Sequence, residues 1–269
     1  MIETKLITQL QELSLLKKAY FEEATVPLDG MWHFGFVAGA PHFGFYIQDK
    51  LVGFCCINDD KYLLQYFVNP EFRNFSNDIF AAIVNNKNTT IGTVAGAFVS
   101  TAELYYQSLC MDNAASIKVN ALMCQHQNAF SNFDSLEMIP AAQNELESYV
   151  RFAVDSIGAP EQWLIQYYGN LIDRQELFGY WQNDELIAAG ECRLFDEYQT
   201  EYAEVGMIIA KSERGKGLAR KVLKFLIKHA DSKNLKAICS TEIDNIAAQK
   251  AIVSAGFRSE HRIVQYEFN

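Results

Sequence analysis

The chain has 269 residues, of which 49% are hydrophobic and 21% are charged, so it has a globular composition and is long enough for two modest cores. Its 33 acidic and 23 basic side chains give a net charge of -10, which argues against general nucleic-acid binding. Its first twenty residues carry several charges, and no apolar run reaches the roughly twenty residues that span a bilayer, so we expect neither a signal peptide nor a membrane segment.

The first half of the chain begins with a predicted hairpin and then alternates strands with helices. The hairpin is predicted over residues 43–52, where aromatic and aliphatic residues flank a Gln-Asp turn. The spacing of apolar residues further predicts strands at 61–68, 92–100 and 116–124 and helices at 76–84 and 102–109. A polar stretch that contains Pro140 follows, and we predict a linker at 127–142 between domains at 1–126 and 143–269.

The second half begins with two predicted helices, then alternates strands with helices, and ends on a strand. Helical spacing is predicted at 144–156, 161–172, 219–230 and 245–255, and strands at 177–181, 186–194, 201–210, 236–241 and 262–268. The first two strands form a hairpin around Asn183 and Asp184. The sequence therefore predicts an α/β fold with two similar domains, each a mixed and mostly antiparallel sheet flanked by helices.

A repeat supports the prediction of two similar domains. Residues 43–52 align with residues 178–187, with identical Phe, Gly, Asp and Leu and with aromatic or aliphatic matches between them. The two halves therefore read as tandem copies of one unit.

The stretch Arg214-Gly215-Lys216-Gly217-Leu218-Ala219 lies between a strand-like and a helix-like run. Two glycines let the backbone turn sharply, and the first helical turn has amide hydrogens without intrahelical acceptors, which favours binding of a phosphate. Nearby basic residues make the local field positive: Arg214, Lys216, Arg220, Lys221, Lys224 and Lys228. The corresponding residues 69–78 of the first copy have no glycine and include Asp78, so we expect no phosphate binding there.

This loop resembles the Arg/Gln-x-x-Gly-x-Gly/Ala loop of the GCN5-related N-acetyltransferases, and residues 245–257 resemble the late helix of that family, which starts at Asn and ends in Gly-Phe. The resemblance covers about residues 140–269. It implies acetyl-CoA as co-substrate, with its pyrophosphate on the backbone from Arg214 to Arg220 and extra charge from Lys216 and Arg220. The residues expected to bind it are Met207, Ile208, Ile209, Arg214, Gly215, Lys216, Gly217, Leu218, Ala219, Arg220 and Asn245. Among these, Met207, Ile208 and Ile209 would offer a strand edge to the pantetheine arm, and Asn245 would approach the arm or only cap its helix.

The same resemblance places the general base at Glu204, on the strand before the loop. The alternative is that Glu204 is an exposed strand residue, and Glu191, Glu201 and Glu242 are lesser candidates for the base. Ile252 stands where many members have the tyrosine that acts as general acid, and it lies on an apolar helical stripe. Ser254 and Tyr266 are possible substitutes for that acid.

The resemblance implies an acetyl-CoA-dependent N-acetyltransferase in which a primary amine of a small molecule or peptide attacks the thioester directly. The alternatives are a non-catalytic CoA-binding regulatory module and an acyltransferase that uses another acyl chain. The six cysteines form no Cys-x-x-Cys pair, and the histidines have no metal-ligand spacing, so we expect a reduced cytoplasmic protein without a metal. The acceptor and the oligomeric state stay open.

Overall fold

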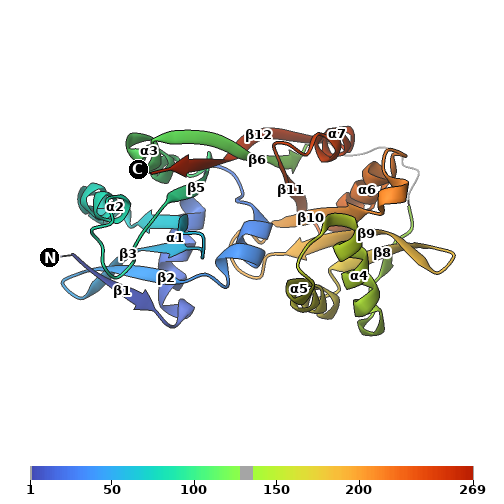
Figure 1. Cartoon of the computed structure of the whole chain (residues 1–269), viewed down its shortest axis with the longest axis horizontal. Coiled ribbons are helices and arrows are strands. Elements are labelled where there is room, and N and C mark those ends of the chain that lie inside the picture. The colour runs from blue at the N-terminus through green and yellow to red at the C-terminus, as the bar shows by residue number, and fades with distance from the viewer. Residues whose placement is uncertain (1, 128–135, 269) are drawn as a thin grey trace. The chain divides into compact units, whose positions relative to one another are not determined.

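The computed structural model describes residues 2–127 and 136–268 of the chain (Figure 1). The chain divides into two compact units: unit 1 comprises Met1–Leu122 with His261–Asn269, and unit 2 comprises Met123–Glu260. Each unit is a mixed α/β structure in which helices flank a sheet, as the sequence predicts. Within the described ranges, no helix is long and apolar enough to cross a membrane.

Unit 1 is built on strands in the order β1-β2-β3-β4-β5-β12. Its elements are β1 (Ile2–Ile7), α1 (Ser14–Glu23), β2 (His42–Ile47), β3 (Lys50–Ile57), β4 (Tyr62–Val68), α2 (Ser76–Val84), β5 (Gly96–Ser100), α3 (Leu104–Asn113) and most of β6 (Ser116–His126). The ladders from β1 to β4 are antiparallel, and β4 pairs with β5 in parallel. The sequence analysis did not predict β1, α1 or the π-helix at Trp32–Val37.

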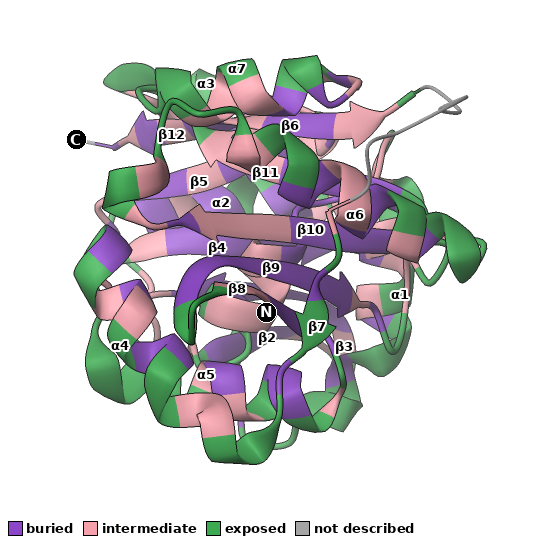
Figure 2. Cartoon of the chain, turned by 90° about the vertical axis from the view of Figure 1, so that its right-hand side faces the viewer, coloured by how far each residue is buried: buried purple, intermediate pink, exposed green. Residues whose placement is uncertain are grey.

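Unit 2 is built on strands in the order β11-β10-β9-β8-β7. Its elements are β7 (Ile139–Pro140), α4 (Leu146–Ile157), α5 (Glu161–Asp173), β8 (Leu177–Gln182), β9 (Glu185–Leu194), β10 (Tyr202–Ile209), α6 (Leu218–Ser232), β11 (Lys236–Glu242) and α7 (Ile246–Ser254). Helix α6 lies on one face of β9 and β10, and α4 lies on the other face (Figure 1). Figure 2 shows β9 largely buried between these layers, while α4 and α5 turn exposed residues outward.

The last strand, β12 (Phe257–Glu267), has residues in both units. The sequence analysis placed residues 262–268 in the second domain, whereas the chain from His261 onward groups with unit 1 because residues 263–267 pair antiparallel with β5. The division into domains at 1–126 and 143–269 stays a prediction. Residues 128–135 of the predicted linker lie outside the described residues.

The two hairpins have the same local geometry, which strengthens the interpretation of the halves as copies. Gln48 and Asp49 have φ angles of 49° and 62°, and Asn183 and Asp184 have the same two values. Both hairpins also shift register at equivalent points, between Phe45 and Tyr46 in unit 1 and between Tyr180 and Trp181 in unit 2. Positive φ at both turn residues twists the chain to suit a two-residue hairpin, so the shared Asp contributes to the same turn in each unit.

Candidate active site

The glycine loop of unit 2 connects β10 to α6 through a short 3-10 turn at Lys211–Glu213. Gly215 and Gly217 both have a φ of +79°, and a Cβ added at either would have no heavy atom within 4 Å. The space around them is therefore open, and the requirement for glycine comes from the backbone angle, which other residues adopt only with strain.

Helix α6 begins at this loop without a local acceptor for its first amides. Gly217 is its N-cap and supplies no side-chain hydrogen bond, and the first turn contains no acidic residue. Arg220 and Lys221 in that turn are exposed. The end of a helix that runs for 15 residues thus presents N–H groups and positive charge, the arrangement that suits an anion.

Two basic side chains of the loop are engaged by the protein itself. The Arg214 guanidinium donates to the carbonyl of Ile209 at 3.3 Å and to that of Ser156, at the end of α4, at 2.7 Å. Lys216 forms an ion pair with Glu213 at 2.9 Å. Arg214 therefore anchors the loop to α4, and the groups left to meet a phosphate are the backbone amides and the exposed side chains of Arg220 and Lys221.

One edge of β10 is open beyond its first residues. Residues 202–204 pair in parallel with residues 236–238 of β11, whereas pairing with β9 continues along β10 to Ile209. Across the parts of the chain that the structure describes, no strand pairs with this edge from residue 205 to residue 209. Met207 and Ile208 are half-buried there, and Ile209 is buried. The open edge leads directly to the glycine loop.

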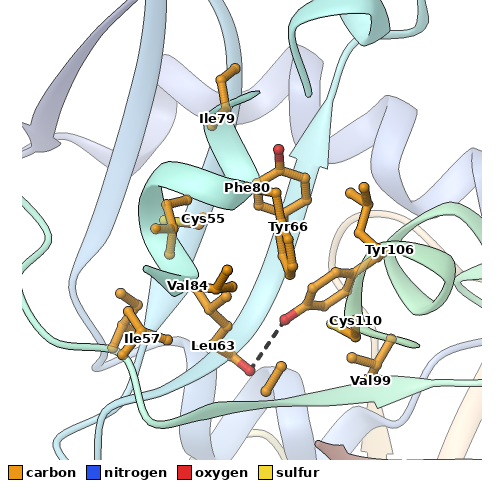
Figure 3. Packing of buried hydrophobic residues seen from close by; sticks show 14 of the residues in the cluster. Cys55, Ile57, Leu63, Tyr66, Ile79, Phe80, Val84, Val99, Tyr106 and Cys110 are labelled. Carbon is orange, nitrogen blue, oxygen red and sulfur yellow. Dashed lines mark hydrogen bonds between the residues drawn. The ribbon is translucent and has the colours of Figure 1, made fainter. Parts of the chain in front are cut away.

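In unit 1, β4 and β5 also pair at their first residues and then separate, but side chains fill the space between them. Ladder pairs between β4 and β5 join Tyr62 to Gly96 and Leu63 to Ala97 only, as far as the described residues go. Figure 3 shows Tyr106 of α3 beside this point, where its hydroxyl donates to the Leu63 carbonyl at 3.4 Å and its ring packs near Tyr66 and Phe80. Tyr106 comes from α3, which follows β5 in the chain as α7 follows β11 in unit 2.

The loop before α2 also differs from its counterpart. The Asn69 side chain accepts the amide of Glu71, and Ser76, the first residue of α2, is buried with its hydroxyl 2.9 Å from that of Tyr66. Asp78 places a negative charge in the first turn. Asp78 and the ion pair of Arg73 with Glu23 leave less positive charge here than at the glycine loop of unit 2.

Glu204 lies on β10 at the base of the open edge and is buried, with an exposed fraction of 1%. The alternative that it is an exposed strand residue is therefore wrong. It lies opposite Arg193 of β9, whose Nη2 donates to Glu204 Oε1 at 3.1 Å. Since burial alone disfavours a charged carboxylate, the guanidinium beside it is what favours the ionised form.

Arg193 joins Glu204 to two further groups, which together we call the arginine cluster: Tyr167, Glu191, Arg193 and Glu204. Arg193 Nη1 contacts Glu191 Oε2 and donates to the Tyr167 hydroxyl at 2.8 Å, and that hydroxyl donates to Glu191 Oε2 at 2.8 Å. Glu191 and Arg193 are 6% and 4% exposed, and burial raises the pKa of Tyr167 well above its usual value. Glu201 and Glu242, the other candidates for a base, are exposed.

The sequence analysis missed Arg193 and Tyr167. The available signal was Glu191 and Arg193 two residues apart on one face of an otherwise apolar strand, which is unusual for a buried strand. Their meeting with Glu204 depends on the register between β9 and β10, which the sequence pattern alone does not give.

Helix α7 holds the remaining predicted residues. Asn245 caps it, with its side chain accepting the Ala248 amide at 3.1 Å, which is the simpler of the two roles expected for it. Ile252 is 4% exposed and therefore part of the packed interior. Of the possible substitutes for the acid, Ser254 is exposed and donates to the Ala251 carbonyl, whereas Tyr266 packs in the core of unit 1.

Comparisons with known proteins agree with this geometry. A profile described as an acetyltransferase (GNAT) domain matches residues 9–127, and one described as the acetyltransferase (GNAT) family matches residues 142–257. The solved structure of a GNAT-family acetyltransferase from Colwellia psychrerythraea is 60% identical, with a TM-score of 0.95 and coverage of 99% of this chain and 100% of that chain. None of the curated proteins matches significantly in sequence.

More distant structures share the fold alone. A GCN5-related N-acetyltransferase from Sphaerobacter thermophilus is 9% identical, with a TM-score of 0.69 over 99% of this chain and 95% of that chain. A tandem GNAT protein from the clavulanic acid biosynthesis pathway is 13% identical, with a TM-score of 0.66 over 99% and 98%. The two profile matches and the identity to the Colwellia protein place the chain as a tandem acyltransferase. The chain belongs to the GNAT acetyltransferase family.

Proposed function

We propose that unit 2 transfers an acetyl group from acetyl-CoA to a primary amine of a small molecule or peptide by direct attack of the amine on the thioester. The observation that carries the proposal is the continuity of the open β10 edge with the uncapped start of α6. The loop amides would hold the pyrophosphate, and Met207, Ile208 and Ile209 would hydrogen-bond the pantetheine arm through their backbones. Asn245 caps α7 through its Oδ1, so its side-chain Nδ2 group would be the part that approaches the arm.

In this reaction the amine nitrogen bonds to the thioester carbonyl carbon, the C–S bond breaks, and the electron pair leaves on the CoA sulfur. Glu204 would take the amine proton, directly or through a water. Ile252 cannot donate a proton, so the thiolate would leave unaided, as a thiol of moderately low pKa can.

Unit 1 would not bind the co-substrate in this proposal. Its loop lacks glycine and runs through a 3-10 turn at Pro70–Phe75 directly into α2, and Tyr106, Tyr66 and Phe80 pack together beside its diverging strands (Figure 3).

A thiol-release assay with acetyl-CoA and a panel of primary amines tests the proposal. We expect amine-dependent release of free thiol, with one acetylated amine formed for each thiol, and loss of both in Gly217→Glu. Thiol release at the same rate without any amine would contradict transfer to an amine. Propionyl- and longer acyl-CoA substrates in the same assay would reveal a preference for another acyl chain.

A further inference from the structure

The arginine cluster connects helix α5 to the proposed base through one guanidinium. Arg193 uses one terminal nitrogen for Glu204 and the other for Glu191 and Tyr167, so a single planar group fixes the direction in which two carboxylates point. Arginine suits this geometry because its donors form a rigid fork, whereas lysine offers a point charge on a flexible stem.

We propose that Arg193, held in place by Tyr167 and Glu191, is a positioning residue that sets where the Glu204 carboxylate lies and the pH at which it accepts the proton of the acceptor amine. This inference rests on the proposed function, because it takes Glu204 as the base.

Arg193 is the charged group whose contact with Glu204 is described, through its Nη2 at 3.1 Å. From β9 the groups that face Glu204 are Arg193 and Glu191, and the register partner in β11 is Ile238, which carries no charge. From α5, Tyr167 and Tyr168 reach the cluster, and burial raises the pKa of both hydroxyls well above the usual value, so both stay neutral. A neutral hydroxyl can orient the guanidinium but cannot replace its charge.

Gly206 shows how closely this part of the strand is fitted to the cluster. It lies opposite Glu191, and a Cβ added at Gly206 would come 3.1 Å from Arg193 Nη1 and 3.3 Å from Glu191 Oε2. The half-buried edge of β10, whose next residues are proposed to bind the pantetheine arm, is thus in immediate contact with the groups that hold Glu204.

The first experiment removes the charge of Arg193 without leaving an extra buried carboxylate. In the double variant Glu191→Gln/Arg193→Gln one positive and one negative charge are lost together. We expect the midpoint of the acid limb of kcat/KM to rise by about one pH unit. An adjacent guanidinium lowers a carboxyl pKa by about one to three units, and loss of the Glu191 charge offsets part of that effect. Arg193→Lys should keep the midpoint nearer to that of the wild type while kcat falls, since it restores charge but not the fork.

If the double variant does not fold, a milder variant, Tyr167→Phe, tests the same inference. Tyr167→Phe removes one hydroxyl and keeps the ring that stacks on Trp163. The variant loses the two hydrogen bonds of that hydroxyl, to Arg193 and to Glu191. We expect kcat to fall about three- to ten-fold, with the KM for acetyl-CoA unchanged. Tyr180→Phe is the matched control, because its hydroxyl contacts only Gln182 of the same strand among its described hydrogen bonds, and its kcat should equal that of the wild type.

A purely structural role would lower the melting temperature of these variants without moving the acid limb. The inference is overturned if the folded double variant keeps the midpoint of the wild type, or if Tyr167→Phe keeps its kcat. Glu204→Gln distinguishes a failure of the proposed function from a failure of this inference. If it is fully active, the assignment of the base fails; if it is inactive while the midpoint of the double variant does not move, only the role of Arg193 fails.

Discussion

Glu204 is a buried carboxylate whose charge is balanced by Arg193, and its replacement tests its part in the chemistry. Glu204→Gln should slow acetyl transfer about a hundred- to ten-thousand-fold, the range typical of a general base, and leave acetyl-CoA affinity within a few-fold. The loss should shrink at high pH, where the amine is already neutral. Rates measured across pH with one amine would show this, and an unchanged rate near neutrality would remove Glu204 from the mechanism.

For Ile252, the packing of its side chain and the proposed chemistry both argue against a tyrosine at this position. Its side chain is buried in α7, so Ile252→Tyr must fit a larger polar ring into a packed interior at a cost of about 1 to 3 kcal/mol. We expect a lower melting temperature and no gain in turnover. A large increase in thiol release would instead mean that the site lacks only a general acid.

On the scale of elements, the glycine loop and the start of α6 form one device for binding an anion. Gly217→Glu would put a strained backbone and a negative charge at the N-cap, so it should abolish the rise in melting temperature that acetyl-CoA produces. Asn74→Glu, in the corresponding loop of unit 1, is the matched control and should keep the full rise. Loss of the rise in both variants would mean that the two loops are not as different as their structures indicate.

Elements with a strong repeat of apolar residues could be predicted from the sequence, and elements with a weak repeat could not. Helix α2 was predicted at 76–84 and spans Ser76–Val84, because its apolar residues repeat at helical spacing. Helix α1 was missed because only Leu16 and Tyr20 of its ten residues are buried, which leaves a weak stripe. The π-helix at Trp32–Val37 has no periodic signature that would identify it.

The residues of the candidate site were likewise predictable only in part. The glycine loop was predictable because it is contiguous in sequence, and the cap formed by Asn245 was predictable as one of two roles. The pairing of Glu204 with Arg193 was not, because it arises from the register of two strands. The alternating pattern of β12 also did not predict its pairing with β5, because alternation identifies a strand but not its partner.

For the whole molecule, two histidines of unit 1, buried His42 and half-buried His33, should make stability depend on pH. Burial and the charge of Lys17 lower the pKa of His42 to about 4, and the same causes lower that of His33 to about 3. The unfolded chain, with histidine pKa values near 6.5, therefore binds more protons than the folded chain below that pH. Their contribution to stability is present above about pH 6.5 and is lost as the pH falls toward 4.

The measurement is the free energy of unfolding in denaturant between about pH 4 and pH 8. We expect the wild type to lose stability across the acid half of this range, and His42→Gln, which cannot titrate, to lose about 1 to 3 kcal/mol less. Glu103 acts in the opposite sense, since burial raises its pKa to about 7 and favours the folded state at low pH. For this reason the difference between variant and wild type, and not the absolute slope, is the test; parallel curves would contradict it.

The pairing of β12 with β5 has a consequence for how the chain is made. The hydrogen bond between Thr101 and His261, beside that ladder, joins residues 160 apart in sequence. At typical rates of synthesis, about 5 to 20 residues per second, the β5 edge waits on the order of ten seconds before its partner leaves the ribosome. During that time a nascent chain carries an unpaired strand edge, which other chains can bind. Factors that shield emerging polypeptides should therefore matter more for this protein than for one whose first half closes its own sheet.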